Sequence, residues 1–100
     1  MILSIIIPIY NVEQYIDKCL QSLIRQHYDK SEYEIIAVLD ACTDCSEEIA
    51  KFNLESSGIA HTILYIDCRS AGLSRNAGLE IARGKYIYFV DGDDYLIDLL

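Results

Sequence analysis

Leu3-Ser4-Ile5-Ile6-Ile7-Pro8-Ile9 opens the chain as a nearly uninterrupted apolar run in which four of the seven residues are isoleucine. β-Branched side chains favour strands. A continuous apolar run, in place of strict alternation, is typical of a strand that is covered on both faces. The run therefore predicts a buried strand over Leu3–Ile9, of the kind found in parallel sheets that carry helices on both sides.

A helix is predicted directly after this strand. Asn11 is a candidate N-cap, and Gln14 stands at the capping-box position. Apolar side chains then recur at helical spacing, at Val12, Tyr15, Ile16, Cys19, Leu20, Leu23 and Ile24.

Farther along, strands and helices continue to alternate. The apolar runs predict strands over Glu34–Leu39, His61–Ile66 and Lys85–Val90. A second helix is predicted over Cys45–Glu55, with Asp44 and Glu47 as its capping pair and with Ile49 and Phe52 on its apolar face. A third helix is predicted from the stripe Leu73, Ala77 and Ile81, with Gly84 as its end.

This alternation predicts an α/β fold with three layers and a largely parallel sheet. In such a sheet the carboxyl ends of all strands meet at one edge, where ligands bind. Polar or acidic residues follow every predicted strand: Tyr10 and Asn11, then Asp40, then Asp67, and finally Asp91, Asp93 and Asp94. We therefore expect these groups to gather at one rim.

Composition narrows the possible ligands. The chain has 100 residues, enough for one small domain or part of a larger one, and a formal net charge of −8. Nucleic acid binding depends on neutralising phosphates with Lys and Arg, so this charge argues against it. A phosphorylated ligand remains possible if a divalent cation, aimed N–H groups or an Arg meets the phosphate.

Location can also be predicted. No stretch approaches the 18 apolar residues that a membrane span needs, so we expect no transmembrane segment. The start lacks the basic region and cleavage site of a signal peptide. The four cysteines then indicate a cytoplasmic protein with free thiols.

The strongest chemical signal is Asp91-Gly92-Asp93-Asp94. Neighbouring carboxylates repel one another unless a cation lies among them, and Mg²⁺ or Mn²⁺ prefers oxygen ligands. Gly92 would let the backbone approach a ligand closely. The alternative is a solvated acidic turn. The position after a strand of a parallel sheet favours the metal-binding interpretation.

Asp40 and Asp44 carry a second signal. Asp40 ends a predicted strand, where a carboxylate can accept hydrogen bonds from a ribose or a base. Asp44 is better explained as a cap of the following helix.

Two further segments leave alternatives open. Cys42 and Cys45 form a CxxC pair that suits a redox couple or half a zinc site, but the lack of a second pair favours free thiols. Ser70–Asn76 is a turn of small residues that runs into a helix. It is either an anion site, with Arg75 or Arg69 on a phosphate, or an ordinary connection.

With these residues in view, the sequence resembles the family 2 glycosyltransferases of the GT-A fold. Five ordered blocks carry the resemblance and span essentially the whole chain: Ser4–Asn11, Val12–Gln26, Ile35–Asp40, Gly72–Gly78 together with Ala82–Ile87, and Asp91–Asp94. The last block resembles the extended DxD motif of the family. The resemblance implies the Rossmann-like half of a nucleotide-diphospho-sugar transferase.

The resemblance also implies roles for individual residues. Pro8, Tyr10 and Asp40 would hold the nucleobase and ribose, with UDP the expected nucleotide. Gly72 and Arg75 would belong to the same donor site. Asp91 would face the ribose and metal, and Asp93 would coordinate Mn²⁺ or Mg²⁺. The implied activity is an inverting, metal-dependent sugar transfer to a saccharide or lipid-linked acceptor, at the cytoplasmic face of a membrane.

Departures from the family pattern limit this interpretation. Leu39 stands where the family often has Asp, and Ala41, Cys42 and Cys45 replace Gly, Ser and Gly. The family's general base lies in a later segment, so residues 1–100 are expected to be a truncated, donor-binding portion with no catalytic residue of its own. Alternatives are a nucleotide-sugar-binding module without turnover, and a receiver-like regulatory domain. Lys85 begins its strand, at the wrong edge for the latter.

Overall fold

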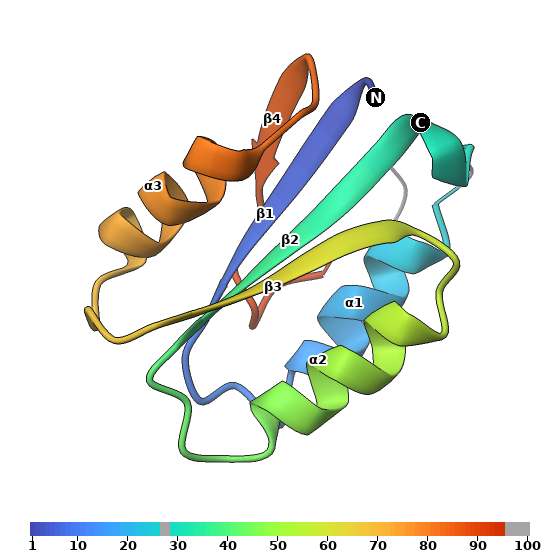
Figure 1. Ribbon diagram of the computed structural model, residues 1–100. Coiled ribbons are helices and arrows are strands. Elements are labelled where there is room, and N and C mark those ends of the chain that lie inside the picture. The colour runs from blue at the N-terminus through green and yellow to red at the C-terminus, as the bar shows by residue number, and fades with distance from the viewer. Residues whose placement is uncertain (27–28, 96–100) are drawn as a thin grey trace.

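The computed structural model describes residues 1–26 and 29–95. Within them the chain alternates between strands and helices, with one short 3₁₀ turn (Figure 1). The elements are β1 (Leu3–Ile9), α1 (Ile16–Ile24), η1 (Lys30–Glu32), β2 (Tyr33–Asp40), α2 (Ser46–Glu55), β3 (Ala60–Ile66), α3 (Ala71–Ile81) and β4 (Tyr86–Phe89).

All four of these strands are parallel, in the order β3-β2-β1-β4. β1 is central: Ile5 lies opposite Ile35 on one side and opposite Tyr88 on the other. After β3 the chain crosses back over the sheet to place β4 beside β1, which makes the β1–β4 boundary a topological switch point. The predicted parallel α/β sheet is confirmed.

Helices cover both faces of the sheet. Helices α1 and α2 lie on one face and α3 on the other, so the fold has three layers (Figure 1). Along β1, Ile5, Ile7 and Ile9 belong to the larger core beneath α1 and α2, whereas Ile6 belongs to the smaller core beneath α3. This division follows the two-residue period of a strand.

The start of α1 differs from the prediction. The helix begins at Ile16, with Tyr15 at its N-cap position and no capping side chain, so Asn11 and Gln14 do not cap it. Asn11 instead adopts a left-handed conformation with φ of 47°. The predicted stripe holds from Ile16 onward, where Ile16, Cys19, Leu20 and Leu23 are buried, but Tyr15 is exposed.

The apolar faces predicted for α2 and α3 are partly wrong. Phe52 is exposed, and α2 packs through Ile49, Ala50 and Leu54. Glu47 does not take part in a capping pair; it forms an ion pair with Lys51. In the third helix Leu73 and Ile81 are exposed, while the buried residues are Ser74 and Gly78.

Small residues let α3 lie close to the sheet. A Cβ on Gly78 would come within 2.5 Å of Ile6 Cγ2, so only glycine fits there. Gly84 does not end α3, which stops at Ile81 with Ala82 as its C-cap. A Cβ on Gly84 would instead lie 2.5 Å from the backbone nitrogen of Ser4. Close backbone approach, and not chain reversal, explains both glycines.

A buried acid fastens the amino edge of the sheet, opposite the carboxyl ends. Glu34 on β2 is fully buried and accepts hydrogen bonds from Ser4 Oγ at 2.6 Å and from the Arg83 backbone N–H at 2.7 Å. The Arg83 guanidinium adds an ion pair at 3.2 Å. Burial alone would raise the pKa of Glu34, but the hydrogen bonds from Ser4 and Arg83 outweigh it and hold this pKa below its usual value.

Glu34→Gln should therefore destabilise the fold by roughly 2–3 kcal/mol, the usual scale of a lost hydrogen bond to a charged group. Urea unfolding at pH 7 measures this difference. Glu80→Gln, on the exposed surface of α3, is the control and should change the free energy of unfolding by less than about 0.5 kcal/mol. Equal effects of the two substitutions would contradict the role given to Glu34.

Candidate functional site

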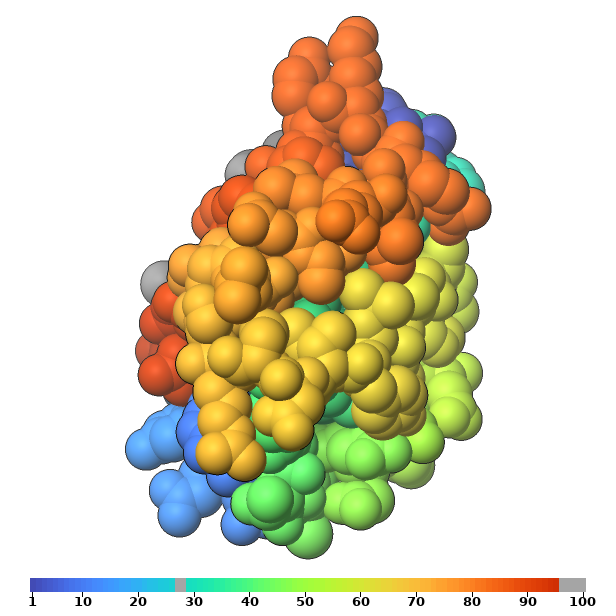
Figure 2. Space-filling view, turned by 60° about the vertical axis from the view of Figure 1, so that its left-hand side comes forward, coloured from blue at the N-terminus to red at the C-terminus, as the bar shows by residue number. Residues whose placement is uncertain are grey.

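The carboxyl ends of the strands border a cleft of about 330 Å³. The loops after β1 and β2 and the start of α3 gather at one end of the molecule, at the bottom of Figure 2. The cleft is lined by Pro8, Ile9, Tyr10, Val12, Asp40, Arg69, Ser70, Ala71, Ser74, Asp91, Gly92 and Asp93. Pro8, Tyr10, Asp40, Asp91 and Asp93, which the sequence singled out, thus come together in one cleft.

Asp40 is the most enclosed of these residues, with only 3% of its surface exposed. Its carboxylate accepts hydrogen bonds from the backbone N–H groups of Cys68, Arg69 and Ser70, each at 2.9 Å. The hydroxyl of Ser74 donates a further bond at 3.3 Å. Asp40 therefore shapes the β3–α3 loop, which forms one wall of the cleft.

This arrangement favours the ionised form of Asp40. Burial would raise the pKa of the carboxyl group, but the N–H groups of Arg69, Cys68 and Ser70 overcome that effect and lower the pKa below its ordinary value of 3.8. The backbone of Arg69 is held at a φ of 52°, in the left-handed region. Hydrogen bonds to Asp40 offset part of the cost of that conformation.

The acidic cluster, defined here as Asp91, Asp93 and Asp94, follows β4. A backbone hydrogen bond from Asp94 N–H to Asp91 C=O closes the turn at 3.0 Å. One carboxylate oxygen from each residue lies within 4.8 Å of the others, and all three side chains are exposed. This donor set is the kind that hard divalent cations prefer.

Gly92 serves packing in this turn. A Cβ at Gly92 would lie 2.9 Å from Val12 Cγ2 and 3.4 Å from the carbonyl oxygen of Pro8. The close contact predicted from Gly92 is therefore with the protein's own β1–α1 segment, and it draws the acidic cluster toward β1.

The negative field of the cluster reaches the core. Cys19 on α1 is buried and its thiol faces the carbonyl oxygen of Asp91 at 3.6 Å. Burial, reinforced by the charges of Asp94, Asp93 and Asp91, raises the pKa of Cys19 to about 12. The three acids thus act together on a neighbouring group.

Arg75 and Gly72 do not line the cleft. Arg75 nevertheless reaches the acidic cluster, because its Nη2 lies 3.0 Å from Asp91 Oδ1. Gly72 is the second residue of α3, and Ser70 caps that helix by accepting from the N–H of Leu73 at 3.3 Å. The turn of small residues therefore presents a helix N-terminus at the cleft, as one of its two interpretations requires.

Two groups at this edge make contacts that were not predicted from the sequence. Ser74 lies in the Ser70–Asn76 segment singled out above, but its burial against Asp40 was not predicted. Asn11 joins the loops after β1 and β2: its side-chain oxygen accepts from Thr43 N–H at 2.8 Å and its amide donates to Thr43 Oγ1 at 3.1 Å. Left-handed φ at Asn11 makes this contact possible.

The loop after β2 carries the residues that depart from the family pattern. Ala41 takes a φ of 53°, a conformation that costs a non-glycine residue about 1–2 kcal/mol. Asp44 is not the N-cap that the sequence predicted, because α2 begins at Ser46 with Cys45 at the N-cap position; its carboxylate nevertheless accepts from Ser46 N–H at 2.9 Å. It also accepts from Glu13 N–H at 3.1 Å, which ties the loop to the β1–α1 segment.

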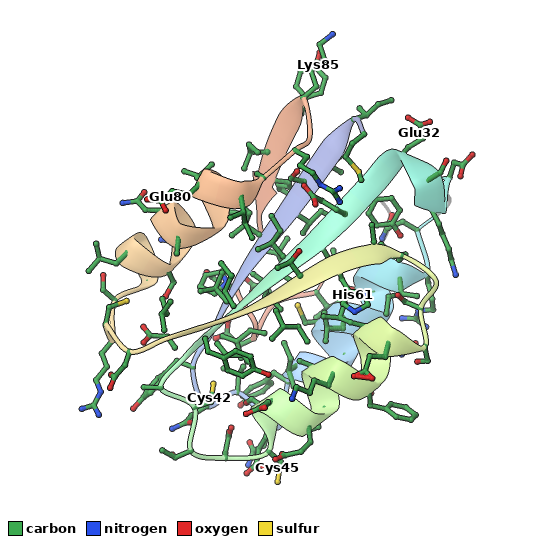
Figure 3. All side chains as sticks on the ribbon, viewed as in Figure 1. Glu32, Cys42, Cys45, His61, Glu80 and Lys85 are labelled. Atoms are coloured by element: carbon green, nitrogen blue, oxygen red, sulfur yellow. The ribbon has the colours of Figure 1, made fainter. Side chains whose placement is uncertain are left out.

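All four cysteines are free, as the sequence predicted. Figure 3 shows Cys42 and Cys45 in the β2–α2 loop with side chains pointing in different directions. Among residues 1–26 and 29–95, the acidic cluster is the group with metal-ligand geometry, and it includes neither cysteine. In the same residues no helix has the length and apolar character needed to cross a bilayer.

Comparison with known proteins agrees with the fold and identifies the family. A family model described as "Glycosyl transferase family 2" matches residues 4–98. The glycosyltransferase GlyA of Streptococcus pneumoniae is 48% identical over 96 residues, which cover 94% of this chain but 13% of that protein.

Solved structures give the same result. The chain superposes on TarS 1–349 of Staphylococcus aureus in complex with UDP-GlcNAc with a TM-score of 0.89 and 34% identity, covering 95% of this chain and 27% of that one. The mannosyltransferase PcManGT of Pyrobaculum calidifontis, in complex with GDP-Man and Mn²⁺, shares the fold with a TM-score of 0.87 at 24% identity, over 93% of this chain and 28% of that one.

This chain thus spans less than a third of the length of each of these proteins. The match to the family model nevertheless covers nearly all of the chain, and on that basis this protein belongs to glycosyl transferase family 2.

Proposed function

We propose that this chain holds the nucleotide-diphospho-sugar donor of a glycosyltransferase whose whole protein transfers the sugar to a saccharide or lipid-linked acceptor. The observation that carries the proposal is a single cleft at the β1–β4 switch point. An exposed aromatic ring, a helix N-terminus and two carboxylates of the acidic cluster border it. Membership of the family supports the same reaction.

The nucleoside end of the donor is assigned to the β1 side of the cleft. Tyr10 is 55% exposed and lines the cleft beside Pro8, so its ring is available to stack on a base. UDP is the proposed nucleotide, in keeping with the UDP-GlcNAc bound to the similar TarS. Asp40 acts indirectly in this proposal: its hydrogen bonds fix the loop of residues 68–70, against which the ribose would rest.

The diphosphate is assigned to the side of the acidic cluster. Asp91 and Asp93 line the cleft and offer carboxylate oxygens. These residues fit Mn²⁺ or Mg²⁺, since the cluster supplies oxygen ligands and leaves positions open to phosphate. When bound, such a cation supplies Lewis-acid stabilisation of the leaving nucleoside diphosphate. Asp93 and Asp91 would hold it, and Arg75 lies within reach of the same region.

The proposed reaction is an inverting substitution at the anomeric carbon. The acceptor oxygen forms a bond to that carbon, the bond to the diphosphate oxygen breaks, and the nucleoside diphosphate leaves with the electron pair. The hydroxyl proton passes to a general base, which we assign to a part of the whole protein outside residues 1–100. The chain's own contribution is to bind and orient the donor.

The two alternatives fare differently. Membership of glycosyl transferase family 2 rules out the receiver-like interpretation. Lys85 also lies at the end of the molecule opposite Cys42 and Cys45, away from the acidic edge (Figure 3). Binding without turnover remains the second candidate, since the described cleft supplies donor contacts and the chain covers 13% of the length of GlyA.

Asp93→Ala should abolish the effect of Mn²⁺ on nucleotide binding. In the wild type we expect Mn²⁺ to strengthen UDP binding by roughly tenfold or more, because the cation joins two groups of like charge. Calorimetric titration of UDP with and without Mn²⁺ measures this. Glu80→Ala is the control, which should leave the Mn²⁺ effect unchanged: Glu80 is an exposed acid near the end of α3 and does not line the cleft.

If Mn²⁺ strengthened UDP binding equally in the wild type and in Asp93→Ala, the assignment of the metal to the acidic cluster would be wrong. If neither protein bound any nucleoside diphosphate, the donor-site proposal itself would fail. Release of free sugar from UDP-sugar by the protein would contradict binding without turnover.

Asp40→Asn should destabilise the fold by about 2–3 kcal/mol at pH 7, because an amide replaces an acceptor that serves three N–H groups. The folded-state pKa of Asp40 is depressed, so its contribution is present above pH 3.8 and is lost as the pH falls through the folded-state pKa. Urea unfolding from pH 7 to pH 3 should show the gap between wild type and variant narrowing. A constant difference in unfolding free energy between wild type and variant over that range would contradict the role of the ionised Asp40 carboxylate.

A further inference from the structure

One ion pair joins α3 to the acidic cluster across the switch point. Arg75 Nη2 lies 3.0 Å from Asp91 Oδ1, and the two side chains are 36% and 51% exposed. The same Asp91 contributes an oxygen to the group of carboxylates that lie within 4.8 Å of one another. Asp91 therefore belongs both to the ion pair with Arg75 and to the acidic cluster.

The electrostatics of this arrangement are unfavourable without a counter-charge. Three carboxylates in one turn repel one another, and within the described residues Arg75 is the cationic side chain paired with them. Lys18 also lies nearby, with its Nζ 3.9 Å from the centre of the ring of Tyr95, the residue after Asp94, but within the described residues it forms no ion pair with the three acids. The guanidinium thus supplies part of the positive charge that the cluster requires.

A divalent cation on Asp91 would lie next to this guanidinium. Two positive charges a few ångströms apart repel each other, and partial exposure to water reduces that repulsion without removing it. Binding of the cation and retention of the Arg75–Asp91 pair are therefore in competition.

We propose that Arg75 is a built-in counterion of the acidic cluster, which competes with the divalent cation for Asp91 and is released when the cation binds. This inference rests on the proposed function, because it takes the acidic cluster as the cation site. In the free protein Arg75 holds Asp91 from just outside the cleft, and its release leaves a positive charge beside the proposed position of the diphosphate. Removing the charge of Arg75 is therefore expected to favour the cation alone and to disfavour the diphosphate.

The test is direct titration of Mn²⁺ in the absence of nucleotide, followed by electron paramagnetic resonance of the free ion. Arg75→Gln removes the charge and keeps a shorter polar side chain. It should strengthen Mn²⁺ binding roughly two- to fivefold, the range expected for a partly exposed ion pair. The gain should shrink at high salt.

Arg25→Gln is the matched control. It makes the same change in net charge at an exposed site just past the end of α1. That site is about 13 Å along the helix from Ile16, whose side chain adjoins Gly92. It should leave Mn²⁺ affinity unchanged. In a second titration at saturating Mn²⁺, Arg75→Gln should weaken UDP binding about two- to fivefold, opposite in sign to its effect on the cation alone.

Weaker or unchanged Mn²⁺ binding in Arg75→Gln would overturn the inference, and so would an equal gain in Arg25→Gln. Both results leave the donor site intact if Asp93→Ala still abolishes the Mn²⁺ effect on UDP. Absence of Mn²⁺ binding in the wild type would overturn this inference together with the metal assignment beneath it. Circular dichroism of each variant checks that the fold is retained.

Discussion

Parallel pairing on both sides of β1 is the constraint on which the rest of the structure depends. β1 is bonded to β2 on one side and to β4 on the other, with Ile6 opposite Ile36 and Phe89. Because all three strands run the same way, whatever follows them must appear at the same edge. Asp40 and the acidic cluster are 51 residues apart at their nearest (from position 40 to position 91), yet this geometry brings both to one cleft.

The strands could be predicted from the sequence more reliably than the helices because their signal is a continuous apolar run. β1 occupies the predicted residues, and the other strands differ by one or two residues at their ends. Helix faces depend on how closely a helix approaches the sheet, which periodicity of large side chains does not reveal. α3 packs through Gly78 against Ile6, so its large residue Leu73 is left outside. Asn11 was misread as a cap because its partner, Thr43, is distant in sequence.

The identity of the site residues was predictable, but their contacts were not. An acid at the end of β2 is visible in the sequence; that its carboxylate would face the backbone of residues 68–70 depends on a loop 28 residues farther along. The substitutions at Ala41, Cys42 and Cys45 also proved compatible with the loop. Ala41 accepts a left-handed φ, and hydrogen bonds through Asn11, Asp44 and Ser46 join the loop to the β1–α1 segment at several points. Those bonds offset a conformational cost of about 1–2 kcal/mol.

Charge is the remaining difficulty for a protein of net charge −8 that is proposed to bind a diphosphate. The fold confines the conflict to one point. On the α3 side, the cleft is bordered by Arg69 and the N-terminus of α3, which favour an anion, and Arg75 lies just beyond its lining. On the β4 side, three carboxylates repel it unless a cation is present. The positive and negative sides of the cleft meet at the Arg75–Asp91 ion pair, in which the two charges neutralise each other in the free protein. An acidic surface is therefore compatible with the proposed anionic donor, because the donor and its cation together would replace a charge pair that the protein already contains.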